Sequence, residues 1–123
     1  MSAGNDTLRA RLGAEGLDWI VPGWEAPANV VAVSTTRRGG AAGGLDLGPS
    51  RLAEAADPRA VAADRARLAS FLPSEPIWLH QVHGTRVAEV DASNRARLAG
   101  SPPDADAAVT RARGLAIAVR AAD

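Results

Sequence analysis

Hydrophobic residues along this chain fall into short runs whose spacing and composition are typical of β-strands. Residues 17–24 (LDWIVPGW) predict a short strand that ends at the turn-forming pair Pro22 and Gly23. Residues 29–36 (NVVAVSTT) are rich in β-branched side chains and predict a second strand. The second half of the chain contains further runs of this kind, at residues 76–83, 86–91, 107–110 and 114–122. A chain made mainly of short strands is therefore expected.

One segment instead has the spacing of an amphipathic helix, and it begins at Asp57 and Pro58. Aspartate is a good helix N-cap, and proline is favoured at the first helical position, where it has no hydrogen bond to lose. Hydrophobic side chains follow on one face of this helix, at Val61, Leu68 and Leu72. Charged side chains are predicted on its other faces, at Arg59, Asp64 and Arg67. The helix should end near residues 72–76 (LPSEP).

The polar and glycine-rich segments between these elements predict loops. Residues 37–48 carry five glycines and no periodicity, and residues 93–106 are mostly polar. Gly84 and Thr85 predict the turn between the neighbouring strands. Helix and strands together place the chain in the α+β class.

The order of elements also predicts how the chain divides. Residues 1–16 are expected as a flexible N-terminal segment with a short helix over Thr7–Leu12. Residues 17–123 are expected as one domain. Residues 115–119 (LAIAV) show no polar alternation, so their strand should be buried on both faces. Chains rarely end in such a strand, so this end of the chain is unusual.

Composition narrows the partners that this chain can have. Its formal net charge is zero, which argues against nonspecific nucleic-acid binding, because that binding needs an excess of basic residues. No apolar run has the length of a membrane span, so no membrane partner is expected. The N-terminus lacks the apolar core of a signal peptide, and a cytoplasmic location is the default. The absence of cysteine leaves the chain without thiolate ligands.

Both histidines, His80 and His83, lie in the segment IWLHQVHGTRV at residues 77–87. Side chains three apart in a strand point to opposite faces, so the pair is not expected to hold one metal ion. His80 is expected to be structural or solvent-facing. His83 is either a metal ligand or a solvated histidine at the end of a strand. Gln81 either orients the site and its substrate or forms a strand-edge hydrogen bond to backbone.

Two further positions are candidates for chemistry. Arg37 and Arg38 stand beside Gly39 and Gly40, and guanidinium and backbone N–H groups together suit a phosphate ion. The alternative is an ordinary solvated loop. Asp106 either takes part in proton transfer and ligand positioning or begins a strand as a turn residue.

Several segments, in order, carry a resemblance to one family: STTRRGG, LDLG, DPRAVAADRARLASFL, IWLHQVHGTRV and DADAAVTRARGLAIAVRAAD. Over about residues 17–123 the chain resembles the bacterial laccase-domain or multicopper polyphenol oxidase-type proteins. These are also called the peptidoglycan editing factor family, and they are regarded as purine nucleoside phosphorylases with adenosine deaminase activity. The resemblance implies a mixed α/β sandwich of sheets flanked by helices.

The family's domain is longer than this chain, so the resemblance implies that residues 17–123 are the N-terminal portion of a truncated domain. It also implies a zinc site in the longer protein. The family's zinc ligands are the histidine that matches His83, a cysteine that follows the aspartate matching Asp123, and a later histidine. This chain has only the first, so it is expected to be inactive alone. Copper in place of zinc, with polyphenol oxidation, is the enzymatic alternative, although a multicopper centre needs more histidines than this chain has.

Other site residues follow from the same resemblance. Arg37 matches the family's arginine and is expected to hold phosphate, while Gln81 is expected at the purine nucleoside. Asp46 replaces the family's asparagine and loses two amide donors. Asp106 and Asp123 match family aspartates and are the catalytic candidates. A non-catalytic alternative is a structural piece that forms homo-oligomers through the exposed edge of its last strand.

Overall fold

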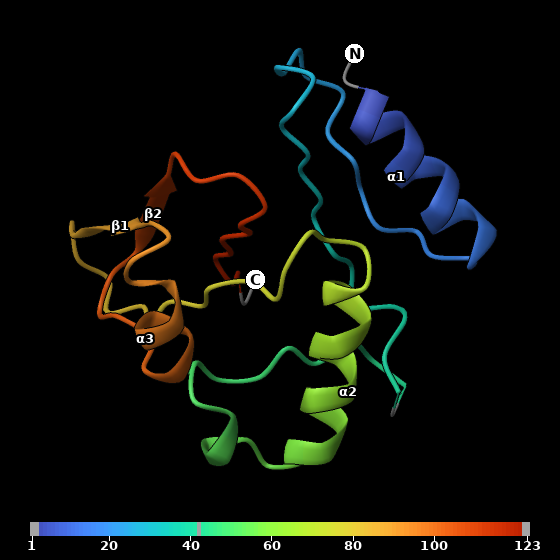
Figure 1. Ribbon diagram of the computed structural model, residues 1–123. Helices are drawn as coiled ribbons and strands as arrows, with labels where there is room; N and C mark the ends of the chain where they lie inside the picture. Colours follow the sequence, from blue (N-terminus) through green and yellow to red (C-terminus); the bar gives the residue numbers. More distant parts are fainter. Residues whose placement is uncertain (1–2, 42, 122–123) are drawn as a thin grey trace. The chain divides into compact units, whose positions relative to one another are not determined.

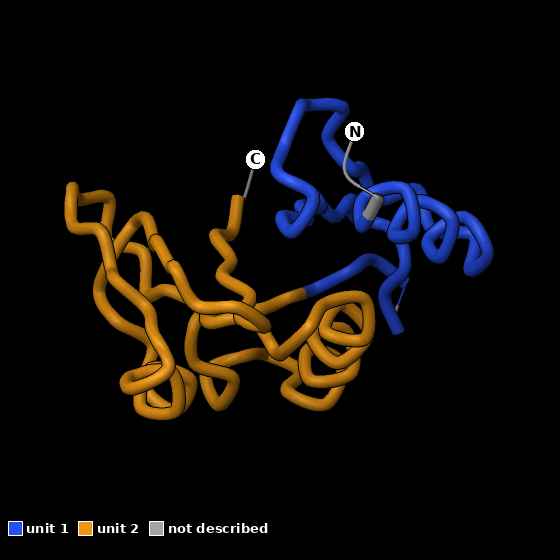
Figure 2. The backbone as a smooth tube through the Cα atoms, turned by 45° about the horizontal axis from the view of Figure 1, so that its top comes forward, with its two compact units in different colours: residues 1–46 blue, residues 47–123 orange. Residues whose placement is uncertain are grey.

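The computed structural model describes residues 3–41 and 43–121, and it confirms a mixed α+β fold (Figure 1). The chain divides into two compact units, residues 1–46 and residues 47–123, shown in two colours in Figure 2. No helix of the described residues is long and apolar enough to cross a membrane. The elements are α1 (Ala3–Ala14), the 3-10 helix η1 (Leu52–Glu54), α2 (Pro58–Ala69), β1 (Val87–Val90), α3 (Arg95–Gly100) and β2 (Ala107–Thr110).

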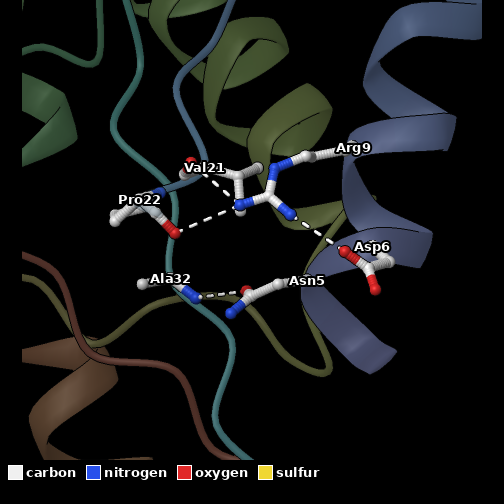
Figure 3. Close-up of polar contacts among 6 residues, drawn as sticks. All are labelled: Asn5, Asp6, Arg9, Val21, Pro22 and Ala32. Atoms are coloured by element: carbon white, nitrogen blue, oxygen red, sulfur yellow. Dashed lines mark hydrogen bonds and ion pairs between the residues drawn. The ribbon is translucent and has the colours of Figure 1, made fainter. Parts of the chain in front are cut away.

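The first unit is built on α1, which begins before and ends after the helix predicted over Thr7–Leu12. Leu8 and Leu12 lie one turn apart on the helix and are 3% and 2% exposed. The polar face of α1 binds the segment that follows the helix in sequence. The Asn5 side chain accepts a hydrogen bond from the Ala32 N–H at 3.2 Å. Arg9 donates to the carbonyls of residues 21 and 22 and pairs with the carboxylate of residue 6 (Figure 3). The segment expected to be flexible, residues 1–16, therefore contains an anchored helix.

The strands predicted over residues 17–24 and 29–36 are wrong. Only one antiparallel bridge forms there, in which Ile20 and Ser34 exchange two backbone hydrogen bonds of 2.8 Å. A strand is maintained by a continuous ladder, and Pro22, which has no N–H, interrupts the donors just beyond this bridge. The β-branched composition of residues 29–36 favoured a strand but could not supply a pairing partner.

The second unit contains α2, and the predicted start of this helix is confirmed. The Asp57 carboxylate accepts from the Ala60 N–H at 3.2 Å, with proline at the first position. Val61 and Leu68 are buried as predicted. Asp64, predicted on a face other than the hydrophobic one, is nevertheless buried, since it is 2% exposed.

Burial of the polar side of α2 has a visible cause in the segment 47–50. A Cβ added at Gly48 would lie 2.6 Å from a methyl group of Val61, so this segment runs directly over the helix. Arg65 donates to the carbonyls of Leu47 and Pro49 at 2.8 and 2.5 Å. The helix is therefore covered over a wider sector than its hydrophobic stripe indicated.

Strands β1 and β2 are confirmed, and they pair in parallel with Val87 opposite Ala107 and Val90 opposite Thr110. Parallel neighbours need a crossover, and α3 provides it between the two strands (Figure 1). The prediction of a loop over residues 93–106 is wrong for this helix. The sequence of this helix is mostly polar, but it contains one buried hydrophobic side chain, Leu98, which is 6% exposed and anchors the helix.

The strand predicted over residues 76–83 is reduced to two isolated parallel bridges, Ile77 with Ile117 and His80 with Asp104. Backbone hydrogen bonds place residues 77–80 between residues 103–105 on one side and residues 116–118 on the other. The hydrophobic side chains of this segment form the centre of the unit, with Leu79 only 1% exposed.

The last predicted strand, residues 114–122, is also reduced to the bridge at Ile117, and residue 122 lies outside the described residues. Burial on both faces is wrong, because Ile117 and Val119 are 37% and 62% exposed. Residues 116–118 pair with Ile77 along one edge, and no other segment of the described residues pairs with them along the opposite edge. The apolar composition of this segment predicted burial, but a segment is buried only where another element covers it.

Candidate functional site: a histidine turn held by Asp106

The turn that carries His83 is held by a single carboxylate. One oxygen of Asp106 accepts from the backbone N–H groups of Val82 and His83, at 3.1 and 2.9 Å. Its other oxygen accepts from the Gly84 N–H at 2.7 Å. The three N–H groups are consecutive, so the carboxylate binds the turn as an anion binds a backbone nest.

His83 has a backbone conformation that few residues adopt. Its φ of 58° lies in the left-handed region, and it is the only described non-glycine residue with a positive φ. Such a conformation persists where surrounding contacts impose it, and strained residues of this kind cluster at functional sites. The contacts with Asp106 provide that constraint, and the His83 side chain stays exposed to solvent.

Electrostatics favour the charged form of Asp106. The hydrogen bond from the Gly84 N–H, with those from His83 and Val82, lowers the pKa of Asp106 below its ordinary value of 3.8, against the opposing effect of partial desolvation. Asp106 is therefore ionised at neutral pH and accepts hydrogen bonds with both oxygens. This arrangement suits a residue that positions His83 better than one that donates a proton.

Gln81 uses its whole amide to join two segments. Its Nε2 donates to the Arg120 carbonyl at 3.0 Å, and its Oε1 accepts from the Arg120 N–H at 2.8 Å. The Gln81 amide thus forms the two hydrogen bonds that a neighbouring strand would form, at a point where backbone pairing has stopped. Of the two roles predicted for Gln81, the hydrogen bond to backbone is the one that this structure displays.

His80 belongs to a different environment from His83, as the strand spacing predicted. Its Nδ1 lies 2.7 Å from the hydroxyl of Ser50, which is 5% exposed. This hydrogen bond ties the segment ahead of η1 to the central segment 77–80. The role is structural.

Arg37 and Asp46 are exposed residues of the first unit, at either end of its glycine-rich loop. The loop closes where the Arg37 carbonyl accepts from the Leu45 N–H at 2.6 Å. A Cβ at Gly40 would overlap the Gly44 backbone, so this close approach requires glycine. The other candidates, Gln81, His83 and Asp106, lie in the second unit, and Asp123 lies outside the described residues.

A complete metal site is not formed by residues 3–41 and 43–121, in which no group of three or more His, Asp or Glu side chains could hold an ion. His83 contributes one imidazole, whereas zinc sites take three or four protein ligands. The described residues therefore do not fit a zinc ion by themselves.

Two arginines that organise this unit were not predicted from the sequence. Arg65 lies 4.8 Å over the Trp78 ring and binds the segment 47–50, while Arg120 donates to the carbonyls of Gly48 and Leu79 at 2.6 and 3.3 Å. Their partners are distant in sequence, and no local pattern identifies them. An arginine in a helix indicates a structural role only once the structure shows that it is buried.

Taken together, the second unit is a small mixed α+β domain in which parallel-paired segments end at an exposed histidine turn. The chain belongs to the family whose model is described as multi-copper polyphenol oxidoreductase laccase, which matches residues 31–123. The histidine turn and Asp106 both lie within the matched residues.

Similar proteins extend beyond the length of this chain. A Pseudomonas aeruginosa protein named purine nucleoside phosphorylase is 40% identical over 109 residues, covering 85% of this chain and 41% of the relative. A Streptomyces griseus protein of the same name is 47% identical over 70 residues, covering 54% of this chain and 28% of the relative. The crystal structure of a Neisseria meningitidis protein is similar with a TM-score of 0.67 and 35% identity, covering 86% of this chain and 42% of that chain. The chain thus spans less than half the length of these relatives.

Proposed function

We propose that this chain contributes the His83 turn to a zinc-dependent purine nucleoside phosphorylase with adenosine deaminase activity, acting in the cytoplasm. The observation that carries the proposal is the anchoring of His83 by Asp106, which holds an exposed imidazole in a strained, fixed turn. The names of the Pseudomonas and Streptomyces relatives support the reaction. Because the described residues supply one ligand, we propose that the 123-residue chain is inactive alone.

Each remaining candidate has a proposed role of its own. Arg37, exposed next to its glycine loop, is proposed to bind phosphate through its guanidinium. Gln81 and Asp46 are proposed at the nucleoside, and Asp46 accepts hydrogen bonds where an asparagine would also donate them. Asp106 positions the turn. Asp123 is proposed as the catalytic carboxylate.

A chimera tests this function. Residues 1–123 would be joined to the remaining sequence of the Pseudomonas relative, and phosphate-dependent release of hypoxanthine from inosine would be measured by chromatography with zinc present. We expect activity in the chimera, no activity in the 123-residue chain, and loss of activity and bound zinc in the chimera with His83→Ala. The matched control is His80→Ala, which should retain bound zinc.

Two outcomes would contradict the proposal. Turnover by the 123-residue chain would show that the missing ligands are not needed. A folded chimera that binds zinc but releases no base, beside an active Pseudomonas relative, would show that residues 1–123 do not support this chemistry.

Copper-dependent oxidation of polyphenols is the second candidate, because the matching family model is described by that activity. The geometry disfavours this activity. His80 bonds to Ser50 and His83 lies in a separate turn, so the two imidazoles do not provide neighbouring ligands for copper. The chimera loaded with copper should therefore fail to oxidise a phenol substrate.

A further inference from the structure

A second polar site lies in the second unit, away from the residues proposed above. It is an open cavity of about 350 Å³ between the start of η1, the start of β1 and the end of α3. Three arginines line it, Arg51, Arg86 and Arg97. His83, Gln81 and Asp106 are not among its lining residues.

The charge of this cavity is positive. Its lining has three guanidiniums, which stay protonated in proteins, against the single carboxylate of Asp104. Arg51 shares its charge with Glu54 at 3.4 Å. Arg97 is close enough to the exposed Asp91 for its charge to help lower the pKa of that carboxyl group. Within the part of the chain that the structure describes, however, the side chains of Arg86 and Arg97 form no ion pair within 4.0 Å like that of Arg51. Two guanidiniums are therefore available to an anion from solution.

The floor of the cavity is rigid. Pro102 and Pro103 connect α3 to β2, and proline fixes its own φ. The chain beyond them is tied on both sides of Asp104, because His80 N–H donates to the Pro103 carbonyl at 2.9 Å and Ala105 N–H donates to the His80 carbonyl at 3.1 Å. The backbone of Arg86 is held as well, because its carbonyl accepts from the Asp106 N–H at 3.2 Å, and Arg97 lies within α3. Backbone that is already positioned lowers the entropic cost of binding.

The lining selects a compact, strongly charged ligand. The only large hydrophobic side chain is Leu98, which is 6% exposed, and no aromatic ring is present to stack on a base. The volume is at the small end for ligand sites, which run from about 300 Å³. Guanidinium forks match the oxygens of a phosphoryl group and bind two of them at once.

We propose that Arg86 and Arg97, with Arg51 and the Ser101 hydroxyl, form a binding site for a phosphoryl group, supplied as free phosphate or as a phosphate monoester. The site does not depend on the metal or on the His83 turn. It differs from the phosphate contact proposed at Arg37, which lies in the first unit.

Binding of inorganic phosphate to the 123-residue chain, measured by calorimetry at low ionic strength, tests the site. We expect saturable binding that Arg86→Gln with Arg97→Gln weakens by at least about tenfold, because two charge-assisted contacts are lost. Arg113→Gln is the matched control, since Arg113 is an exposed arginine of the same unit outside the cavity. Asp104→Asn should tighten binding, and this gain cannot result from misfolding.

The source of the phosphoryl group is resolved by competition. Tighter binding of AMP than of phosphate assigns the site to a monoester, and equal or weaker binding assigns it to free phosphate. The proposal is overturned if phosphate does not bind saturably, if Arg113→Gln weakens binding as much as the double variant, or if adenosine displaces phosphate. A loss of binding in Asp104→Asn would overturn it as well.

Discussion

At the scale of single residues, the principal feature is the contact between Asp106 and the turn at His83. A left-handed backbone at a residue with a Cβ costs about 1–2 kcal/mol, and a histidine adopts it only where other contacts compensate. Three backbone N–H groups that all bond to one carboxylate provide that compensation. The carboxylate comes from a position 22 residues beyond Gly84, just before β2, so the turn is tied to the parallel strand pair.

The lowered pKa of Asp106 predicts how this turn responds to acid. Because the pKa is below 3.8 in the folded chain, the carboxylate contributes stability that is fully present above pH 3.8 and is lost as the pH falls through the lowered value. The Gly84 amide signal in an NMR titration should therefore shift with a midpoint below pH 3.8. A midpoint at or above 3.8 would contradict the hydrogen bonding described.

Neutralising the same side chain should release the turn. Asp106→Asn is expected to speed hydrogen exchange at the amides of Val82, His83 and Gly84, and to weaken zinc binding in the chimera by about 10–100-fold, as losses of ligand-orienting groups do. The control is Asp104→Asn, an exposed neighbour that accepts none of these bonds. Equal exchange in the two variants would show that Asp106 does not hold the turn.

At the scale of elements, the second unit depends on side chains that join segments whose ladders are short. Arg65 connects α2 to the segment 47–50 and covers Trp78, and Gln81 connects the central segment to Arg120. Two four-residue strands alone would be marginal. Side chain–backbone hydrogen bonds therefore replace part of the sheet in this unit.

Arg65→Gln is expected to lower the free energy of unfolding by about 1–3 kcal/mol, because partly buried carbonyls lose their charged donor and Trp78 loses its stacked guanidinium. Chemical denaturation would measure the change. Arg59→Gln is the control, since Arg59 is an exposed arginine on the same helix. Equal stability of the two variants would mean that the contacts of Arg65 contribute nothing measurable.

At the scale of the whole molecule, several valines of the paired segments are exposed. Val87, Val109 and Val119 are 53%, 53% and 62% exposed, and they come from β1, β2 and the last paired segment. An unpaired sheet edge with apolar neighbours is a template for pairing with another chain. The surface adjoins a small apolar cavity that includes Ile117 and Ala118.

We accordingly expect the chain to self-associate through the edge of residues 116–119. Light scattering after gel filtration should show a dimer or larger species at high concentration, and Val119→Glu should shift it toward monomer. Val31→Glu, at an exposed valine of the first unit, should leave the distribution unchanged. A stable monomer at high concentration would contradict this expectation.

Sequence alone determined the elements that depend on local chemistry. The cap at Asp57 and Pro58 placed the start of α2, and short hydrophobic runs placed β1 and β2. The helix α3 was missed, although Asp91 accepts from the Ser93 and Asn94 N–H groups and turns the chain into it. That signal lies in polar residues, which are also the residues of ordinary loops.

The tertiary structure decided every feature that depends on contact with a segment distant in sequence. Extended segments became strands only at residues 87–90 and 107–110, because a strand exists through the ladder of its neighbour and most other segments form single bridges. Burial of Asp64 and exposure of Val119 followed from which segments cover them. The pattern of residues identified His83 as a candidate, but the carboxylate that holds it is distant in sequence, and a contact between distant residues is set by packing, not by local propensity.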